Sequence, residues 1–181
     1  MATTTQQLTL QDFLTLPSIE ESPAWELVDG QVNQKSMPTA HHSILQKRLT
    51  AVIDQADSPY EAFPELRCTL SHNSVVPDIT VIHQDRIPTE DTAVEGAPDW
   101  IIEILSPDQS TTKLIAKIQT CLQEGTQLGW LIDSEERVIM VLSPDSRIIL
   151  LRNSDHLPLP QDNIPLNLTV EQVFAWLRAS R

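Results

Sequence analysis

The chain has 181 residues, of which 40% are hydrophobic and 20% are charged, a composition typical of a folded globular protein rather than a disordered one. Acidic residues outnumber Lys and Arg by 25 to 12, and the net charge of −13 disfavours strong, nonspecific binding to nucleic acid, because contacts to phosphate dominate that affinity. No apolar run approaches the roughly 18 residues that span a bilayer, so we expect no membrane partner.

The N-terminal part predicts a short helix followed by a β-hairpin. The helix is expected to begin at Thr9, whose hydroxyl can cap the amide of Asp12. Two strand-like runs, WELV and QVNQ (25–28 and 31–34), flank the dipeptide Asp29-Gly30. Because this dipeptide favours the tightest hairpin turn, we expect the two runs to pair with each other.

Further along the chain, helical and strand patterns alternate. Apolar residues recur at helical spacing over 39–56, and again on one face of a helix that follows Ser110. The hydroxyls of 110–112 can cap that second helix, and Gly125 is well placed to end it. Strands are expected in six runs: 65–70, 75–82, 100–105, 127–132, 137–142 and 147–151.

A last helix is expected from about Thr169, which forms a T-x-x-Q capping box with Gln172. The order of helix, strands, helix, strands and helix predicts an α/β or α+β fold, in which helices flank a mixed sheet. No internal repeat or linker interrupts the chain, so we expect a single domain over 1–181.

An acidic residue, Glu103, interrupts the most apolar run of the chain, Trp100–Leu105. Side chains alternate along a strand, and both faces of this run are apolar, so the strand is expected at the centre of the sheet. An unpaired carboxylate there would be several kcal/mol unfavourable. A metal ion, a cationic side chain or a proton must therefore compensate Glu103, near the strand end where open α/β sheets bind ligands.

A second carboxylate, Asp78, interrupts the apolar run 75–82 in the same way. If the two strands are adjacent, both carboxylates converge on one point. Mg²⁺ prefers oxygen ligands and keeps several waters, so two carboxylates and a substrate phosphate are enough to hold it. The alternative is purely structural, with Asp78 capping a turn and Glu103 in an ion pair.

Lys117 lies on the flank of the apolar face of the helix after Ser110, from where its amine can reach the preceding strand. It is expected to pair with Glu103 or to polarise a water and a phosphate oxygen, whereas Lys113, one turn earlier, is expected to be solvated. The tandem His41-His42 offers a further ligand or an acid or base, although a surface or capping role is commoner and a zinc site is the least favoured.

With these residues placed, the sequence resembles the PD-(D/E)XK nuclease superfamily and, within it, the restriction-endonuclease-like Uma-two family. The similarity covers roughly 10–149 and depends on segments in a fixed order. They are WELVDG (25–30), a His at the start of the next helix, VPD (76–78), PDWIIEILSP (98–107), Lys117 with Gly125, and WLID (130–133).

The resemblance implies a restriction-endonuclease-like core with a central four-stranded mixed sheet, and Asp78 and Glu103 as metal ligands. The superfamily places a lysine two residues after the second acid, where this chain has Leu105. In the related family the lysine has moved to the following helix, and Lys117 matches that place. Glu26 matches an early acidic residue and is either an additional metal ligand or a structural residue of the hairpin.

The chain departs from the family pattern on the helix that carries Lys117. Members often have an acidic residue one turn before that lysine and an aromatic residue one turn after it, where this chain has Lys113 and Cys121. The change from acid to base alters the local electrostatics, so the resemblance implies the fold more directly than the activity.

Residues and resemblance together predict a metal-dependent endonuclease that hydrolyses phosphodiester bonds in DNA. Asp78 and Glu103 would hold Mg²⁺ (or Mn²⁺), and Lys117 would orient the attacking water and offset developing negative charge. Two other functions stay open. One is a catalytically inactive nuclease-fold binding module, which the acidic surface favours, and the other is a metal-dependent hydrolase of a small phosphoester.

Location and assembly follow from weaker signals. The first residues lack the positive and apolar regions of a signal peptide, and the two cysteines, Cys68 and Cys121, have no CxxC spacing. Reduced thiols in the cytoplasm are therefore expected. Nucleases that cut both strands often act as dimers, and the apolar C-terminal segment with Trp176 offers a surface for a homodimer.

Overall fold

The computed structural model describes residues 8–161 and 163–178. The segment 1–7, which contributes to the expectation of no signal peptide, lies outside these residues. The elements follow one another in the order α1 (Leu10–Leu14), β1 (Trp25–Val28), β2 (Gln31–Gln34), α2 (Ala40–Gln55), β3 (Tyr60–Pro64), β4 (Cys68–Thr69), β5 (Ser74–Val75), β6 (Ile79–His83), the 3-10 helix η1 (Gln84–Arg86), β7 (Val94–Glu95), β8 (Trp100–Ile104), α3 (Thr111–Gln123), β9 (Leu128–Asp133), β10 (Val138–Leu142), β11 (Ile148–Leu151) and α4 (Val170–Ala175).

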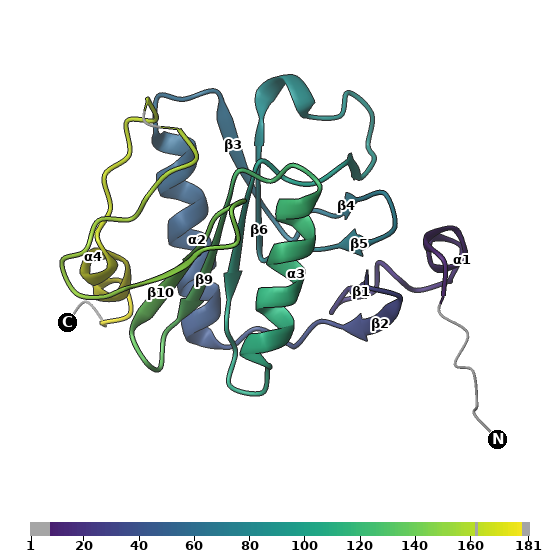
Figure 1. Ribbon diagram of the computed structural model, residues 1–181, viewed down its shortest axis with the longest axis horizontal. Helices are drawn as coiled ribbons and strands as arrows, with labels where there is room; N and C mark the ends of the chain where they lie inside the picture. Colours follow the sequence, from purple (N-terminus) through teal and green to yellow (C-terminus); the bar gives the residue numbers. More distant parts are fainter. Residues whose placement is uncertain (1–7, 162, 179–181) are drawn as a thin grey trace.

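The strands form two sheets. The central sheet has six strands in the order β11-β10-β9-β8-β6-β3, in which β8 and β9 are parallel and the other neighbours antiparallel. Helices α2 and α3 lie on opposite sides of it, and a smaller sheet of order β2-β1-β5-β4-β7 lies beside it (Figure 1). The expected α/β fold with a mixed sheet flanked by helices is confirmed. The central sheet has six strands rather than the four that the resemblance implied.

Strand β8 lies at the centre of this sheet and is buried along its whole length. Trp100, Ile102 and Ile104 pack into one apolar core with residues of α2 and α4, while Ile101 packs into a second core with residues of α3. Because side chains alternate along β8, its residues contribute to two apolar cores, one on each face of the sheet. The central position expected from the sequence is confirmed.

Helix α3 packs closely against the sheet at Gly129 of β9. A Cβ atom at Gly129 would lie only 2.3 Å from Cγ2 of Ile118 on α3 and 3.4 Å from Cγ2 of Ile101 on β8. Any larger residue would push the helix away from the sheet. This close approach sets how near the side chains of α3 come to those of β8.

Two of the expected strands differ in the structure. The run 75–82 is divided into β5 and β6, because Pro77 has no N–H to donate to a ladder. Asp78 therefore lies directly before β6 rather than inside a continuous strand. The expected strand over 65–70 is confirmed only in part: β4 covers Cys68–Thr69, whereas β3 ends at Pro64 and the chain turns at Glu65, which has a positive φ of 52°.

Most of the expected turns and caps are confirmed. The hydroxyls of Thr9 and Thr169 accept the predicted capping hydrogen bonds, and Thr169 forms its capping box. Gly125, after the end of α3, has a φ of +112° that a residue with a side chain rarely adopts. Ser110 occupies the N-cap position of α3, but its hydroxyl contacts that of Thr112 and makes no capping bond. None of the described helices has both the length and the apolar character needed to cross a bilayer.

Candidate active site

The two carboxylates predicted from the sequence lie on neighbouring strands. Glu103 is in β8, Asp78 directly precedes β6, and these strands are paired antiparallel, with Ile79 opposite Ile102. Both side chains are buried, each residue being 1% exposed. Oδ2 of Asp78 accepts a hydrogen bond of 2.7 Å from the backbone N–H of Ile104, which holds the first carboxylate against the strand that carries the second.

Lys117 of α3 reaches the same place. Its residue is 3% exposed, and its Nζ lies 2.6 Å from Oε1 of Glu103 and 2.6 Å from Oε1 of Glu26. It also donates a hydrogen bond of 3.2 Å to the carbonyl of Val76. The structure therefore brings together the three residues expected at the catalytic centre, and Leu105, at the usual superfamily position of the lysine, packs against the apolar core instead.

Glu26 joins this cluster from β1 of the smaller sheet. Its Oε1 accepts a hydrogen bond of 2.6 Å from the backbone N–H of Val76 and forms the ion pair with Lys117. Both contacts connect the hairpin to the segment before β6. Both roles left open for Glu26 stay predictions, and its carboxylate lies beside the lysine.

A second buried lysine, Lys35, was missed by the sequence reasoning. It follows β2, is 9% exposed, and donates hydrogen bonds of 2.8 Å to Oδ1 of Asp78 and 2.7 Å to the carbonyl of Val76. The strand break at Pro77 leaves that carbonyl outside a ladder, so that it accepts from Lys35 and Lys117 together. Lys35 stands in a polar stretch without periodicity, and no signal in the sequence distinguished it from a solvated residue.

Of the tandem histidines only His42 reaches the site. His42 is 5% exposed, with Nε2 3.4 Å from Oδ1 of Asp78 and Nδ1 3.2 Å from Oγ of Ser106, whereas His41 is exposed. On the same helix, the side-chain amide of Gln46 donates to the carbonyl of Asp78. Helix α2 thus holds Asp78 from the side opposite α3.

Three carboxylates face two ammonium groups in this cluster, so one negative charge remains uncompensated when Glu26, Asp78 and Glu103 are all ionised. Burial raises the pKa of Glu103 to about 8, because nearby Lys117 offsets the desolvation only in part. Burial acts in the same sense on Asp78, but Lys35 and His42 outweigh it and hold the pKa of that carboxyl well below its usual range. A proton on Glu103 makes the cluster neutral.

Lys117 stays charged in this surrounding. Burial by itself lowers the pKa of its amine, but the carboxylates of Glu103, Glu26 and Asp78 outweigh that effect and raise the pKa above its ordinary value. The same balance holds at Lys35: burial lowers the pKa of its amine, but nearby carboxylates, Asp78 above all, outweigh burial and raise that pKa above its ordinary value. Both lysines are therefore fixed positive charges rather than proton acceptors near neutral pH.

The donor set fits a hard divalent cation through two carboxylates. Among the described residues, no group of three or more His, Cys, Asp or Glu side chains is arranged to hold a metal ion. Oε1 of Glu103, however, is a buried oxygen whose described partner is the ammonium group of Lys117, at 2.6 Å. Asp78 and Glu103 with waters and a substrate oxygen supply the ligands that Mg²⁺ prefers.

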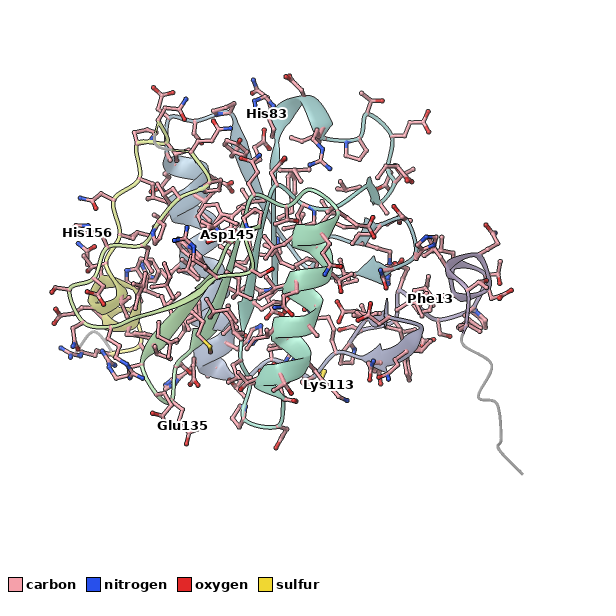
Figure 2. The ribbon with its side chains drawn as sticks, viewed as in Figure 1. Phe13, His83, Lys113, Glu135, Asp145 and His156 are labelled. Carbon is pink, nitrogen blue, oxygen red and sulfur yellow. The ribbon has the colours of Figure 1, made fainter. Side chains whose placement is uncertain are left out.

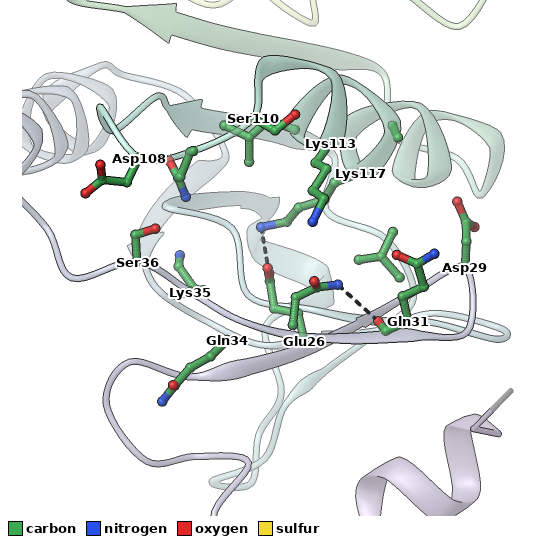
Figure 3. A pocket seen from close by; sticks show the side chains of 15 residues that line it. Glu26, Asp29, Gln31, Gln34, Lys35, Ser36, Asp108, Ser110, Lys113 and Lys117 are labelled. Atoms are coloured by element: carbon green, nitrogen blue, oxygen red, sulfur yellow. Dashed lines mark hydrogen bonds and ion pairs between the residues drawn. The ribbon is translucent and has the colours of Figure 1, made fainter. Parts of the chain in front are cut away.

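A cleft of about 460 Å³ opens over this cluster, between the β1–β2 hairpin and the first half of α3. Figure 3 shows Lys113 and Lys117 extending from α3 into the cleft and Glu26 meeting Lys117 from the hairpin side. Lys35 lines the opposite wall. Of the cluster, Glu26 and the two lysines line this cleft, whereas Asp78 and Glu103 are not among its lining residues and contact it through Lys35 and Lys117.

A mixed sheet with two buried carboxylates on adjacent strands and a lysine from the next helix defines a restriction-endonuclease-like protein. The model of the Uma2 family, described as "putative restriction endonuclease", matches residues 10–173, and the chain belongs to this family. A crystal structure described as that of "a putative nuclease belonging to DUF820" from Anabaena variabilis ATCC 29413 is 41% identical, with a TM-score of 0.86, over 94% of this chain and 99% of the other. No curated protein matches the chain.

Proposed function

We propose that the protein is a metal-dependent endonuclease that hydrolyses phosphodiester bonds in DNA. Membership of the Uma2 family and the similarity to a protein described as a nuclease support the general class. The observation that carries the proposal is the buried cluster of Asp78, Glu103 and Lys117, whose lysine lines a cleft. A purely structural core would have little reason to bury these charges, since apolar residues of similar volume are usually at least as stable.

Asp78 and Glu103 would hold Mg²⁺ or Mn²⁺, and Glu26 lies next to them on the other side of Lys117. When bound, such an ion supplies Lewis-acid stabilisation of phosphate charge and lowers the pKa of a water. Lys35 keeps Asp78 ionised and oriented through its 2.8 Å hydrogen bond. The deprotonated form of Glu103 is the one that would hold a cation, and its proton would be released to solvent.

Lys117 contributes a fixed positive charge. Because its pKa is raised, it does not act as a general base near neutral pH. Its ammonium group instead lies where a phosphate in the cleft would develop negative charge, and a preorganised cation in a buried site stabilises that charge strongly. This role corresponds to the electrostatic part of what is expected of Lys117, and the same ammonium group can donate a hydrogen bond that orients the attacking water.

A catalytically inactive binding module is the second candidate. The observation that favours it is that Lys35 and Lys117 already neutralise Asp78 and Glu103. In such a protein the ion pairs would replace the metal ion, and the cleft would bind a ligand without hydrolysing it. The two candidates differ in whether a divalent cation enters the cluster.

Cleavage of supercoiled plasmid and of single-stranded circular DNA in Mg²⁺ or Mn²⁺ tests the proposal. We expect metal-dependent cleavage that falls by at least about a hundredfold in Asp78→Asn and Glu103→Gln, because each loses part of a charge stabilisation of several kcal/mol. Glu135→Gln is the matched control, since Glu135 is an exposed carboxylate at the β9–β10 turn (Figure 2).

Two results would overturn the proposal. Cleavage retained in both site variants would place the activity elsewhere or in a contaminant. Hydrolysis of bis(p-nitrophenyl) phosphate with both DNA substrates left intact would indicate a hydrolase of small phosphoesters, which the volume of the cleft also accommodates.

A further inference from the structure

The lysines of this chain are concentrated in one place. The sequence has only four lysines, and three of them, Lys35, Lys113 and Lys117, line the cleft above the candidate site. The fourth, Lys47, is exposed on α2, which covers the opposite face of the sheet. The molecule has a net charge of −13, but the residues that line this cleft include as many lysines as acidic residues. The three acidic residues are Glu26, Asp29 and Asp108.

Lys113 differs from the other two lysines in having no acidic partner. Lys35 and Lys117 form ion pairs with buried carboxylates, whereas Lys113 is exposed and, among the described residues, makes no ion pair. It lies one turn before Lys117, and both side chains extend into the cleft (Figure 3). Its charge is therefore free to meet an anion that enters from solvent.

The remaining wall of the cleft consists mainly of neutral hydrogen-bonding side chains. Strand β2 contributes amides and α3 contributes a hydroxyl at its start, together with a serine after Lys35: Gln31, Asn33, Gln34, Ser36 and Ser110. β2 is the edge strand of the smaller sheet, and most of its side chains are exposed. Lysine, amide and hydroxyl groups are the types that contact the phosphates and sugars of nucleic acids without reading their sequence.

Depth and charge together favour a single strand over a duplex. Asp78 and Glu103 are each 1% exposed and are paired with Lys35 and Lys117, which line the cleft of about 460 Å³, so this cleft is the approach to them among the described residues. That volume matches one small ligand or nucleotide rather than a duplex. A duplex also carries one charge per roughly 1.7 Å of axis, about twice the density of an unpaired strand, and is repelled more strongly by an acidic protein.

We propose that the cleft binds one unpaired strand of DNA and that Lys113 contacts a phosphate beside the one that reaches the buried cluster. This inference rests on the proposed function and names its substrate as an unpaired rather than a paired strand. The contact is to the backbone and is independent of base sequence, because lysine, amide and hydroxyl groups, which contact phosphate and sugar, make up most of the polar lining of the cleft.

The test is binding of a fluorescein-labelled oligothymidylate of about ten nucleotides, and of the same strand in a duplex, measured by anisotropy in Ca²⁺ over a range of salt concentrations. We expect the single strand to bind at least about tenfold more tightly than the duplex. In Lys113→Ala, binding of the single strand should weaken roughly fivefold, and the slope of log K against log salt should fall by about 0.7, the value for one lost phosphate contact. Lys47→Ala, which removes the one lysine outside the cleft, should change neither quantity.

Equal binding of strand and duplex, or a Lys113→Ala variant with unchanged affinity and salt slope, would overturn the inference. These outcomes are separable from the fate of the proposed function. Metal-dependent cleavage that is insensitive to Lys113→Ala would sustain the nuclease and contradict the assignment of Lys113. The expected binding pattern without cleavage of either DNA substrate would sustain the strand-binding cleft and contradict the nuclease.

Discussion

The two faces of the central sheet use the same strands for opposite purposes. On the face covered by α2 and α4, Trp100, Ile102 and Ile104 of β8 pack into a core that is apolar throughout. On the face covered by α3, the same strand presents Ile101 to a second apolar core and then Glu103 to a cluster of charged groups. Along this one strand, apolar packing at Ile101 changes to a buried ion pair at Glu103, two residues later.

The difference shows where stability and chemistry are located. Buried apolar side chains stabilise at roughly 25 cal/mol per Å², whereas a buried ion pair rarely stabilises more than well-packed apolar residues. The α2 face accordingly supplies stability. The α3 face keeps three carboxylates and two lysines, an arrangement that fits the proposed binding of a cation and a phosphate.

Lys117→Met removes one cation from the charged face and should have the largest effect on stability. We expect the metal-free protein to lose about 3 to 5 kcal/mol, because Glu103 and Glu26 are left buried without their partner. Urea unfolding measures the loss, and added Mn²⁺ should recover part of it in the variant. A loss of less than 1 kcal/mol would mean that the lysine is not part of a tightly coupled cluster.

Leu49→Ala tests the apolar face. Leu49 of α2 is fully buried in the core against the sheet, so the variant should lose about 3 kcal/mol through the cavity it leaves. The cleavage rate per folded molecule should be unchanged, because α2 contacts the site through its first half, at His42 and Gln46. If the rate fell in proportion to stability, the two faces would not be independent.

The sequence predicted the residues that interrupt a pattern, and it missed those that do not. Asp78 and Glu103 were found because each breaks an apolar run, and Lys117 because it flanks an apolar helix face. Lys35 lies in an irregular segment, and its contact with Asp78 depends on how the hairpin folds over the strand break. Their proximity is a finding of the structure, and their catalytic roles stay predictions.

The same reasoning explains the fold-level results. The hairpin, the capped helices and the buried central strand follow from local chemistry and were predicted. The division at Pro77 and the strand β3 were not, because β3 is short and ends in Pro64, and its pairing with β6 depends on contacts distant in sequence. Likewise, the sequence could not show that His42 rather than His41 contacts Asp78, because that contact depends on how α2 packs against the sheet.

The charged face should also give stability an unusual dependence on pH. The folded-state pKa of Glu103, about 8, lies above the ordinary value of 4.5, so the folded protein holds a proton that the unfolded chain releases. Stability of the metal-free protein should therefore fall as pH rises from about 4.5 to about 8, by up to on the order of 1 kcal/mol per pH unit. Glu103→Gln should flatten this decline, and parallel curves for the two proteins in urea unfolding would contradict it.

The smallest effect on stability is expected in α4, which packs on the apolar face of the sheet and is far in sequence from the candidate site. Thr169→Val removes the capping box of α4, whose Val173 and Phe174 pack into that core, and should lower stability by about 1 kcal/mol. Binding and cleavage should be unaffected. A loss of activity at constant stability would show a connection between α4 and the site that the structure does not contain.

The central claim is that the buried cluster on the α3 face binds a divalent cation. Calorimetric titration of the protein with Mn²⁺ near neutral pH tests it most directly. The account predicts one site per chain, release of a proton as Glu103 ionises, and loss of binding in Asp78→Asn but not in Glu135→Gln. Absence of Mn²⁺ binding by the wild-type protein, or binding unchanged in Asp78→Asn, would contradict the account and leave the cluster as a network of ion pairs.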